Sequence, residues 1–161
     1  MAVDNAARGF ALAGALAAAA ALPALAQEPA IVDGSQVEVI LAIAQAHGPA
    51  SLEAQPNGDP RIAGEMDGLT YQASFSSCID NTACRDMTFQ AGFLDSKLPL
   101  EVINAWNRDT RFGTAYLDSA SDACVSFDLT LEHGVTRGNL EAAFTLWRQV
   151  LARYTAYIGY E

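Results

Sequence analysis

Histidine is scarce in this sequence, with only His47 and His133 among the 161 residues. Histidine is the side chain that most often acts as a general base at neutral pH, so the commonest catalytic group is nearly missing. His47 falls in the last turn of a predicted helix, where a cation complements the helix dipole, and His133 falls in a turn. Neither stands near a Ser-Gly elbow or a Cys nucleophile in a recognised arrangement, and there is no glycine-rich phosphate loop. The sequence therefore predicts a domain that is not an enzyme and binds no cofactor.

Positive charge is scarce as well. The chain has 9 Lys and Arg residues against 19 Asp and Glu residues, which gives a net charge of −10. A surface of this sign repels the phosphates of nucleic acids and the head groups of anionic lipids. We therefore expect neither nucleic acid nor a membrane as a partner of the mature domain. Acidity of this degree mainly serves solubility, although it would also suit a basic partner.

A long apolar run occurs once, at Phe10–Leu22, after a single basic residue. The run is short for a membrane span, which takes about 20 apolar residues. Pro23 then breaks any helix, and Ala24-Leu25-Ala26 has the small-x-small pattern of a signal peptidase site. Residues 1–26 are therefore predicted to be a signal peptide that is cut before Gln27. An uncleaved N-terminal anchor is the alternative.

Cleavage would leave 135 residues with an unchanged net charge, which is the size of one ordinary domain. We expect residues 27–34 to be a short polar lead-in and residues 35–161 to form a single domain. The mature chain would be periplasmic or secreted. Export also places the cysteines where disulfides form and persist.

Cysteine occurs only three times. Cys78 and Cys84 flank five turn-forming residues between two strand-like runs, and a bridge there would staple the strands near their connection. A structural disulfide is the preferred interpretation. A redox-active pair and a metal site are the alternatives, but redox motifs have two intervening residues and no His lies nearby to complete a metal site. Cys124 is left over, either as a small residue tucked under a neighbouring element or as an exposed thiol that pairs between subunits.

Acidic residues gather around one predicted hairpin, where Asp118, Asp122, Asp128 and Glu132 lie close in sequence. A calcium site is conceivable there. The segment lacks the alternating Asp/Asn ladder with a central Gly that such sites use, so we interpret it as a solvated hairpin. We expect no metal site in this chain.

Hydrophobic periodicity divides the mature chain into helices and strands. Ser35 to Glu38 is predicted as a capping box that starts the first helix, and Pro99 as the first residue of the second. Asp67-Gly68 predicts a tight hairpin turn. The last helix has the clearest apolar stripe, which runs from Leu140 to Ile158. The other predicted elements are a helix that ends before residue 48, strands 51–55, 61–66, 69–75 and 87–93, a helix 99–109, and strands 112–117 and 125–131.

The order α-ββββ-α-ββ-α predicts an α+β domain, in which helices cover one face of an antiparallel sheet. The first four strands are predicted to form a meander. The long last helix is predicted to pack on the sheet, because its stripe would otherwise be exposed to water.

Several motifs together resemble the YbjN-domain family, over about residues 35–155. They are Gly58-Asp59-Pro60, the pair Cys78 and Cys84, Ile103-Asn104-Ala105-Trp106-Asn107, Arg111-Phe112-Gly113-Thr114-Ala115-Tyr116-Leu117-Asp118 and Gly134-Val135-Thr136. The resemblance implies a fold similar to that of the type III secretion chaperones and a role as a bacterial sensory transduction regulator. It supplies no catalytic residues, and it is compatible with a homodimer because chaperones of this fold commonly dimerise.

Polar and aromatic residues in these motifs are the candidates for partner binding: Trp106, Asn107, Arg111, Phe112 and Tyr116. Asparagine is unusual inside a helix, since its side chain competes for backbone hydrogen bonds. Asn104 and Asn107 are therefore expected to lock the helix end onto the next strand. The alternative is a patch that recognises a peptide or a partner strand, and one residue could serve in both ways.

Two functional hypotheses follow. The first is a non-catalytic periplasmic domain that binds another envelope protein through an exposed sheet face or edge. The second is a small-molecule-binding module with a pocket between the last helix and the sheet.

Overall fold

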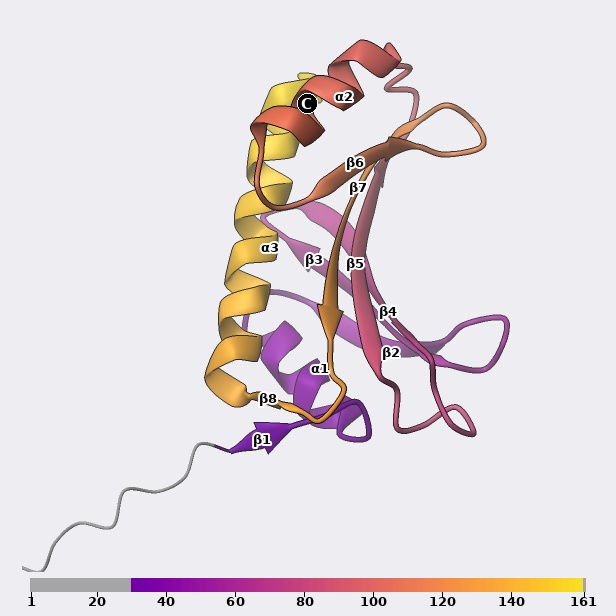
Figure 1. Cartoon of the computed structure of the whole chain (residues 1–161), viewed down its shortest axis with the longest axis vertical. Helices are drawn as coiled ribbons and strands as arrows, with labels where there is room; N and C mark the ends of the chain where they lie inside the picture. The colour runs from indigo at the N-terminus through magenta and orange to yellow at the C-terminus, as the bar shows by residue number, and fades with distance from the viewer. Residues whose placement is uncertain (1–29, 161) are drawn as a thin grey trace, which may run out of the picture.

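The computed structural model describes residues 30–160 (Figure 1). The predicted signal peptide, residues 1–26, lies outside the described residues, as does its predicted cleavage site. Within the described part of the chain, no helix is long and apolar enough to span a membrane. The elements are β1 (Ile31–Val32), α1 (Val37–Gln45), β2 (Ala50–Ala54), β3 (Pro60–Met66), β4 (Leu69–Ser76), β5 (Asp86–Phe93), α2 (Leu100–Asp109), β6 (Thr114–Leu117), β7 (Ala123–Thr130), β8 (Val135–Thr136) and α3 (Arg137–Ile158).

The main sheet is antiparallel, with the strand order β2-β3-β4-β5-β7-β6. The predicted meander of the first four strands is confirmed. Asp67 and Gly68 join β3 to β4 with φ angles of 52° and 82°, which a primed hairpin turn requires. Along the sheet, β7 pairs with β5 and β6 pairs with β7, so β6 becomes an edge strand. The α+β class is thus confirmed, with two short strands added to the predicted order.

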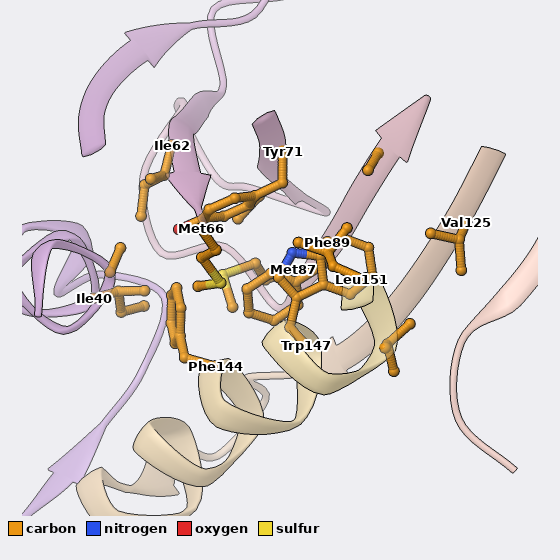
Figure 2. Packing of buried hydrophobic residues seen from close by; sticks show 14 of the residues in the cluster. Ile40, Ile62, Met66, Tyr71, Met87, Phe89, Val125, Phe144, Trp147 and Leu151 are labelled. Carbon is orange, nitrogen blue, oxygen red and sulfur yellow. The ribbon is translucent and has the colours of Figure 1, made fainter. Parts of the chain in front are cut away.

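The helices α1, α2 and α3 all lie on one side of this sheet (Figure 1). The core lies between them and the sheet, and α3 contributes the largest share of its helical side (Figure 2). The ring of Phe89 on β5 lies 4.9 Å from that of Phe144 and 5.5 Å from that of Trp147 on α3. Burial of each such side chain stabilises the fold by roughly 1.5–3 kcal/mol, so the sheet and α3 depend on each other for stability.

The segment that was predicted to be a polar lead-in takes part in the fold. Its residues Ile31 and Val32 pair with Thr136 and Val135 as a two-stranded sheet at the start of α3. Gly34 also bridges to Cys84, so closely that an added Cβ would lie 1.9 Å from the Cys84 carbonyl oxygen. The pairing was missed because a two-residue strand carries no alternation to detect.

The predicted capping box at the start of α1 is wrong. The Ser35 hydroxyl donates to the Asp33 carboxylate at 2.6 Å, and the Asp33 amide donates to the Gln36 side chain at 3.1 Å. These contacts form a polar turn ahead of the helix, which begins at Val37. Hydrogen bonds from Ser35 also lower the pKa of Asp33. A serine with an acidic neighbour two residues earlier has a nearer partner than the helix amides, so it is not free to cap the helix.

Several other boundaries move by one or two residues, and two of these shifts have a clear cause. Pro99 is the cap of α2 rather than its first residue, since its ψ of 147° is extended. β6 begins at Thr114 rather than at residue 112, because Gly113 has a φ of 82° that interrupts the strand. At the start of α3, Thr136 caps the helix, because its hydroxyl accepts a hydrogen bond from the Asn139 amide.

The predicted disulfide is present and joins Cys78 to Cys84. It closes the connection between β4 and β5, where Asp80, Asn81 and Ala83 all have positive φ. The Asn81 side chain donates to Asp59 at 2.9 Å, which ties this connection to the turn between β2 and β3. The bridge therefore holds together a loop whose backbone is costly to order.

Removal of this disulfide is expected to cost about 2 kcal/mol of unfolding free energy, because the bridge closes a short loop in the unfolded chain. The double variant Cys78→Ser/Cys84→Ser should have a lower urea midpoint than wild type and should not respond to reductant. The variant Cys124→Ala, which keeps the bridge, should respond as wild type does. An unchanged midpoint of the reduced wild-type protein would contradict this expectation.

Candidate functional site

The sheet has one face that no described helix covers, because α1, α2 and α3 pack on the other (Figure 1). Alternation along each strand places polar and small side chains there. One row crosses the whole sheet in register, from Ser51 on β2 through Gln72 and Gln90 to Ser126 and Thr114. We call this surface the open face. It comprises Ser51, Glu53, Arg61, Ala63, Glu65, Thr70, Gln72, Ser74, Thr88, Gln90, Gly92, Cys124, Ser126, Asp128, Thr114 and Tyr116.

The open face is hollowed over its central strands, with a cavity of about 740 Å³ that extends from Pro49 and Ser51 at β2 to Asp118 beyond β6. The floor is low where the side chains are small. Ala63 has only a methyl group, and Gly92 faces the Cys124 sulfur so closely that an added Cβ would lie 3.4 Å from it. We call this cavity the hollow. It is on the side opposite α3, whereas a pocket was predicted between the last helix and the sheet, a space that the core fills.

Three side chains meet at one end of the hollow. Gln90 donates a hydrogen bond from its amide to the Tyr116 hydroxyl, and Cys124 lies between them in the sheet, 4% exposed. Burial raises the pKa of Tyr116 to about 12 and also raises the pKa of the Cys124 thiol. Both groups therefore stay protonated at neutral pH, where they act as hydrogen-bond donors rather than as nucleophiles. Of the two alternatives for Cys124, the structure therefore agrees with a small residue buried under its neighbours and not with an exposed thiol.

The Cys124 thiol is expected to react with DTNB at least about tenfold more slowly in the native protein than in urea, because it is both buried and protonated. The native protein should still titrate as one thiol per chain once unfolded, since the other two cysteines are bridged. Equal rates in native and unfolded protein would show that the thiol is exposed.

Asn107 locks α2 onto the edge of the sheet. Its side chain donates to the Ala115 carbonyl at 3.0 Å and accepts from the Ala115 amide at 2.8 Å. One carboxamide thus takes the place of a neighbouring strand along β6. Trp106, 3% exposed, donates to the Gly113 carbonyl at 2.7 Å and adds a second tie to the same segment. Asn104, by contrast, is exposed and no described residue bonds to its side chain.

Replacement of Asn107 by Ala is expected to cost about 1–3 kcal/mol of unfolding free energy, because it leaves two backbone groups of the buried Ala115 unpaired. Asn104→Ala is the matched control, since it removes an asparagine from the same exposed side of α2 without loss of a bond. Its free energy of unfolding, from urea titration, should stay within about 0.5 kcal/mol of the wild-type value. Equal effects of the two changes would argue against the lock.

The five candidate residues for partner binding do not form one patch. Trp106 and Asn107 hold β6 from its outer edge, and Tyr116 lies on the open face. Arg111 and Phe112 are exposed on the connection between α2 and β6, where the guanidinium carbon lies 5.7 Å from the Phe112 ring centroid. The sequence could not separate these positions, because it does not say which strand neighbours β6.

Sequence reasoning also missed the residues of the hollow, such as Glu65, Gln72 and Gln90. The alternation that places them on an outward face was visible along each strand. What was missing was the strand order, since only the pairing of β5 with β7 brings Gln90 beside Cys124 and its neighbours.

The acidic residues around the β6–β7 hairpin are engaged in local contacts. Asp118 accepts hydrogen bonds from the Ala120 amide at 2.8 Å and the Asp122 amide at 2.9 Å. Asp122, 6% exposed, pairs with Lys97 at 2.6 Å, and this hydrogen bond raises the pKa of Lys97. Among residues 30–160, no group of three or more His, Cys, Asp or Glu side chains is placed to hold a metal ion.

Neither histidine lies in the hollow: one stacks on an aromatic ring and the other lies in a turn. The His47 ring stacks on Phe144 with 5.8 Å between centroids, and His133 is exposed in a turn with a φ of 64°. The described residues thus bring neither imidazole to a nucleophile. An uncovered and hollowed sheet face lined by polar side chains is typical of a binding or regulatory module.

The comparison with protein families agrees with this class. A family model with the description "Putative bacterial sensory transduction regulator" matches residues 36–159, which is most of the chain, and the chain belongs to this family, YbjN. The description is that of a regulator and not of an enzyme. No curated protein matches the chain.

Proposed function

We propose that this chain is an exported, non-catalytic regulator domain that recognises another protein of the bacterial envelope through its open face. The hollowed open face is the observation that carries the proposal. A sheet face without helices is compatible with water when it is polar, as this one is, and it leaves a broad surface for a partner. Within this surface, we expect the partner to bind at the hollow, which Gln72, Gln90 and Cys124 line.

Export is supported by two independent features. The predicted signal peptide would direct the chain out of the cytoplasm, and the disulfide between Cys78 and Cys84 fits an oxidising compartment. A domain that acts there meets envelope proteins rather than cytoplasmic ones. Its family description as a sensory transduction regulator is compatible with recognition of such a protein.

A small molecule is the second candidate ligand. The hollow, at about 740 Å³, has the volume of typical ligand sites. Its lining is mixed, with polar side chains such as Gln72 and Gln90 beside small apolar ones such as Ala63, whereas most ligand sites are predominantly apolar, and this favours a protein partner. The second candidate therefore moves from the predicted helix side of the sheet to the open face.

Photo-crosslinking in the native envelope tests the proposal. A photoreactive residue in place of Gln72, exposed on the open face, should yield an adduct with one predominant protein. The same residue in place of Gln149, exposed on α3, should not, because that side is away from the hollow. A thermal-shift screen of metabolites with the purified domain should give no large stabilisation.

Two outcomes would contradict the proposal. Equal adducts at Gln72 and Gln149, or none at native expression, would remove the case for a partner on the open face. A metabolite that stabilises the domain strongly, by mass action on the folded state, would establish the small-molecule alternative instead.

A further inference from the structure

The two edges of the main sheet differ. At β6, the Asn107 side chain occupies the outward backbone groups of Ala115. At β2, the opposite edge, the side chains from Ser51 to Ala54 are all exposed. An exposed edge strand presents unpaired amides and carbonyls that can accept another strand. Only the β6 edge is blocked in this way.

The outward groups of β2 follow from its pairing with β3. The Glu65 amide donates to the Pro49 carbonyl at 2.9 Å, and the Gln55 amide donates to the Asp59 carbonyl at 2.8 Å. Odd-numbered residues of β2 therefore bond to β3, and even-numbered residues point their backbone groups away from the sheet. Of these, the Ala50 carbonyl accepts from Gln45 at 3.2 Å. No described residue bonds to the amides and carbonyls of Leu52 and Ala54.

The surroundings of this edge are acidic. Residues 37–60, which form α1, β2 and the turn after it, contain Glu38, Glu53 and Asp59 but no Lys or Arg. Arg61 on β3 pairs with Glu53 at 2.5 Å. Glu65, exposed on the open face beside β2, makes no ion pair with any described residue. A basic segment fits this edge better than a second copy of a chain whose net charge is −10.

The two sides of the edge also differ in chemistry. Leu52, 41% exposed, faces the helix side of the sheet, where it pairs across the strands with the buried Ile62. Ser51 and Glu53 face the open side, and Ser51 also lines the hollow. An added strand would therefore place alternate side chains against Leu52 and against the acidic open face.

We propose that β2 is the docking edge for an extended segment of alternating apolar and basic residues, which adds to the sheet as a seventh strand. This inference rests on the proposed function and names its mode of recognition. Backbone hydrogen bonds to Leu52 and Ala54 hold the segment, as in other complexes formed by strand addition. Its basic side chains lie near Glu65 and its apolar side chains cover Leu52.

A labelled peptide of about eight alternating Lys and Val residues, a typical strand length, is the probe. Fluorescence anisotropy should show that the full mature domain binds it, and that binding weakens as salt is raised. A matched peptide with Glu in place of Lys should bind at least about tenfold more weakly. Amide hydrogen exchange of Leu52 and Ala54 should slow when the Lys peptide is bound.

Substitutions at the edge separate backbone recognition from side-chain contact. Leu52→Pro removes an outward amide without loss of a bond to β3, a position where edge strands tolerate proline, and should weaken peptide binding at least about tenfold. Leu52→Ala keeps the amide, so it should weaken peptide binding less than Leu52→Pro does. Ala54→Pro tests the same point at a second amide, in case the first variant does not fold. Glu65→Gln should reduce both the affinity and its salt dependence.

Three results would overturn the inference. These are equal binding of the peptide by wild type and both folded proline variants, unchanged exchange at Leu52 and Ala54, or a dimer of the wild-type domain in light scattering that becomes a monomer in Leu52→Pro. The proposed function is tested separately by the crosslink at Gln72. An adduct that persists in Leu52→Pro would refute the docking edge and leave the partner on the open face.

Discussion

The packing of α3 against β5 and its neighbours is the interaction on which the rest of the molecule depends. Phe144 and Trp147 pack on Phe89 at the centre of the buried cluster (Figure 2). Because α3 occupies the middle of the sheet, the shorter α1 and α2 are left to cover its two ends on the same side. The fold therefore has one sealed face and one face that must be polar.

This division leaves the open face of the sheet as the accessible polar surface of the domain. The buried side is occupied by bulky side chains such as Trp147 and Tyr154, which are fully enclosed. The polar side has a hollow because small residues, Ala63 and Gly92, occupy its middle. A regulator that recognises another molecule needs such an accessible surface, and this agrees with the family to which the chain belongs.

Much of the fold could be predicted from local sequence, and the site could not. The apolar stripe from Leu140 to Ile158 predicted the longest helix, and Asp67-Gly68 predicted a hairpin, because helix periodicity and turn geometry are local properties. The disulfide followed from the spacing of Cys78 and Cys84. Strand order is a property of contacts between distant residues, so neither the hollow nor the free edge was visible. Asn107 is an example. Its position inside a helix predicted that its side chain holds the helix end onto the next strand. That this strand, β6, is an edge of the sheet could be seen only in the structure.

The Asn107 lock has a consequence for assembly. A sheet with two free edges can add strands on both sides and grow into a fibre, which is the usual hazard of exposed strands. In the main sheet of the described residues, the carboxamide of Asn107 occupies the outward groups of Ala115 at β6, which leaves β2 as the edge without such a block. A domain with one blocked sheet edge ends a continuous intermolecular sheet and does not extend it. In the proposed mode of recognition, each domain therefore binds one added strand, at β2.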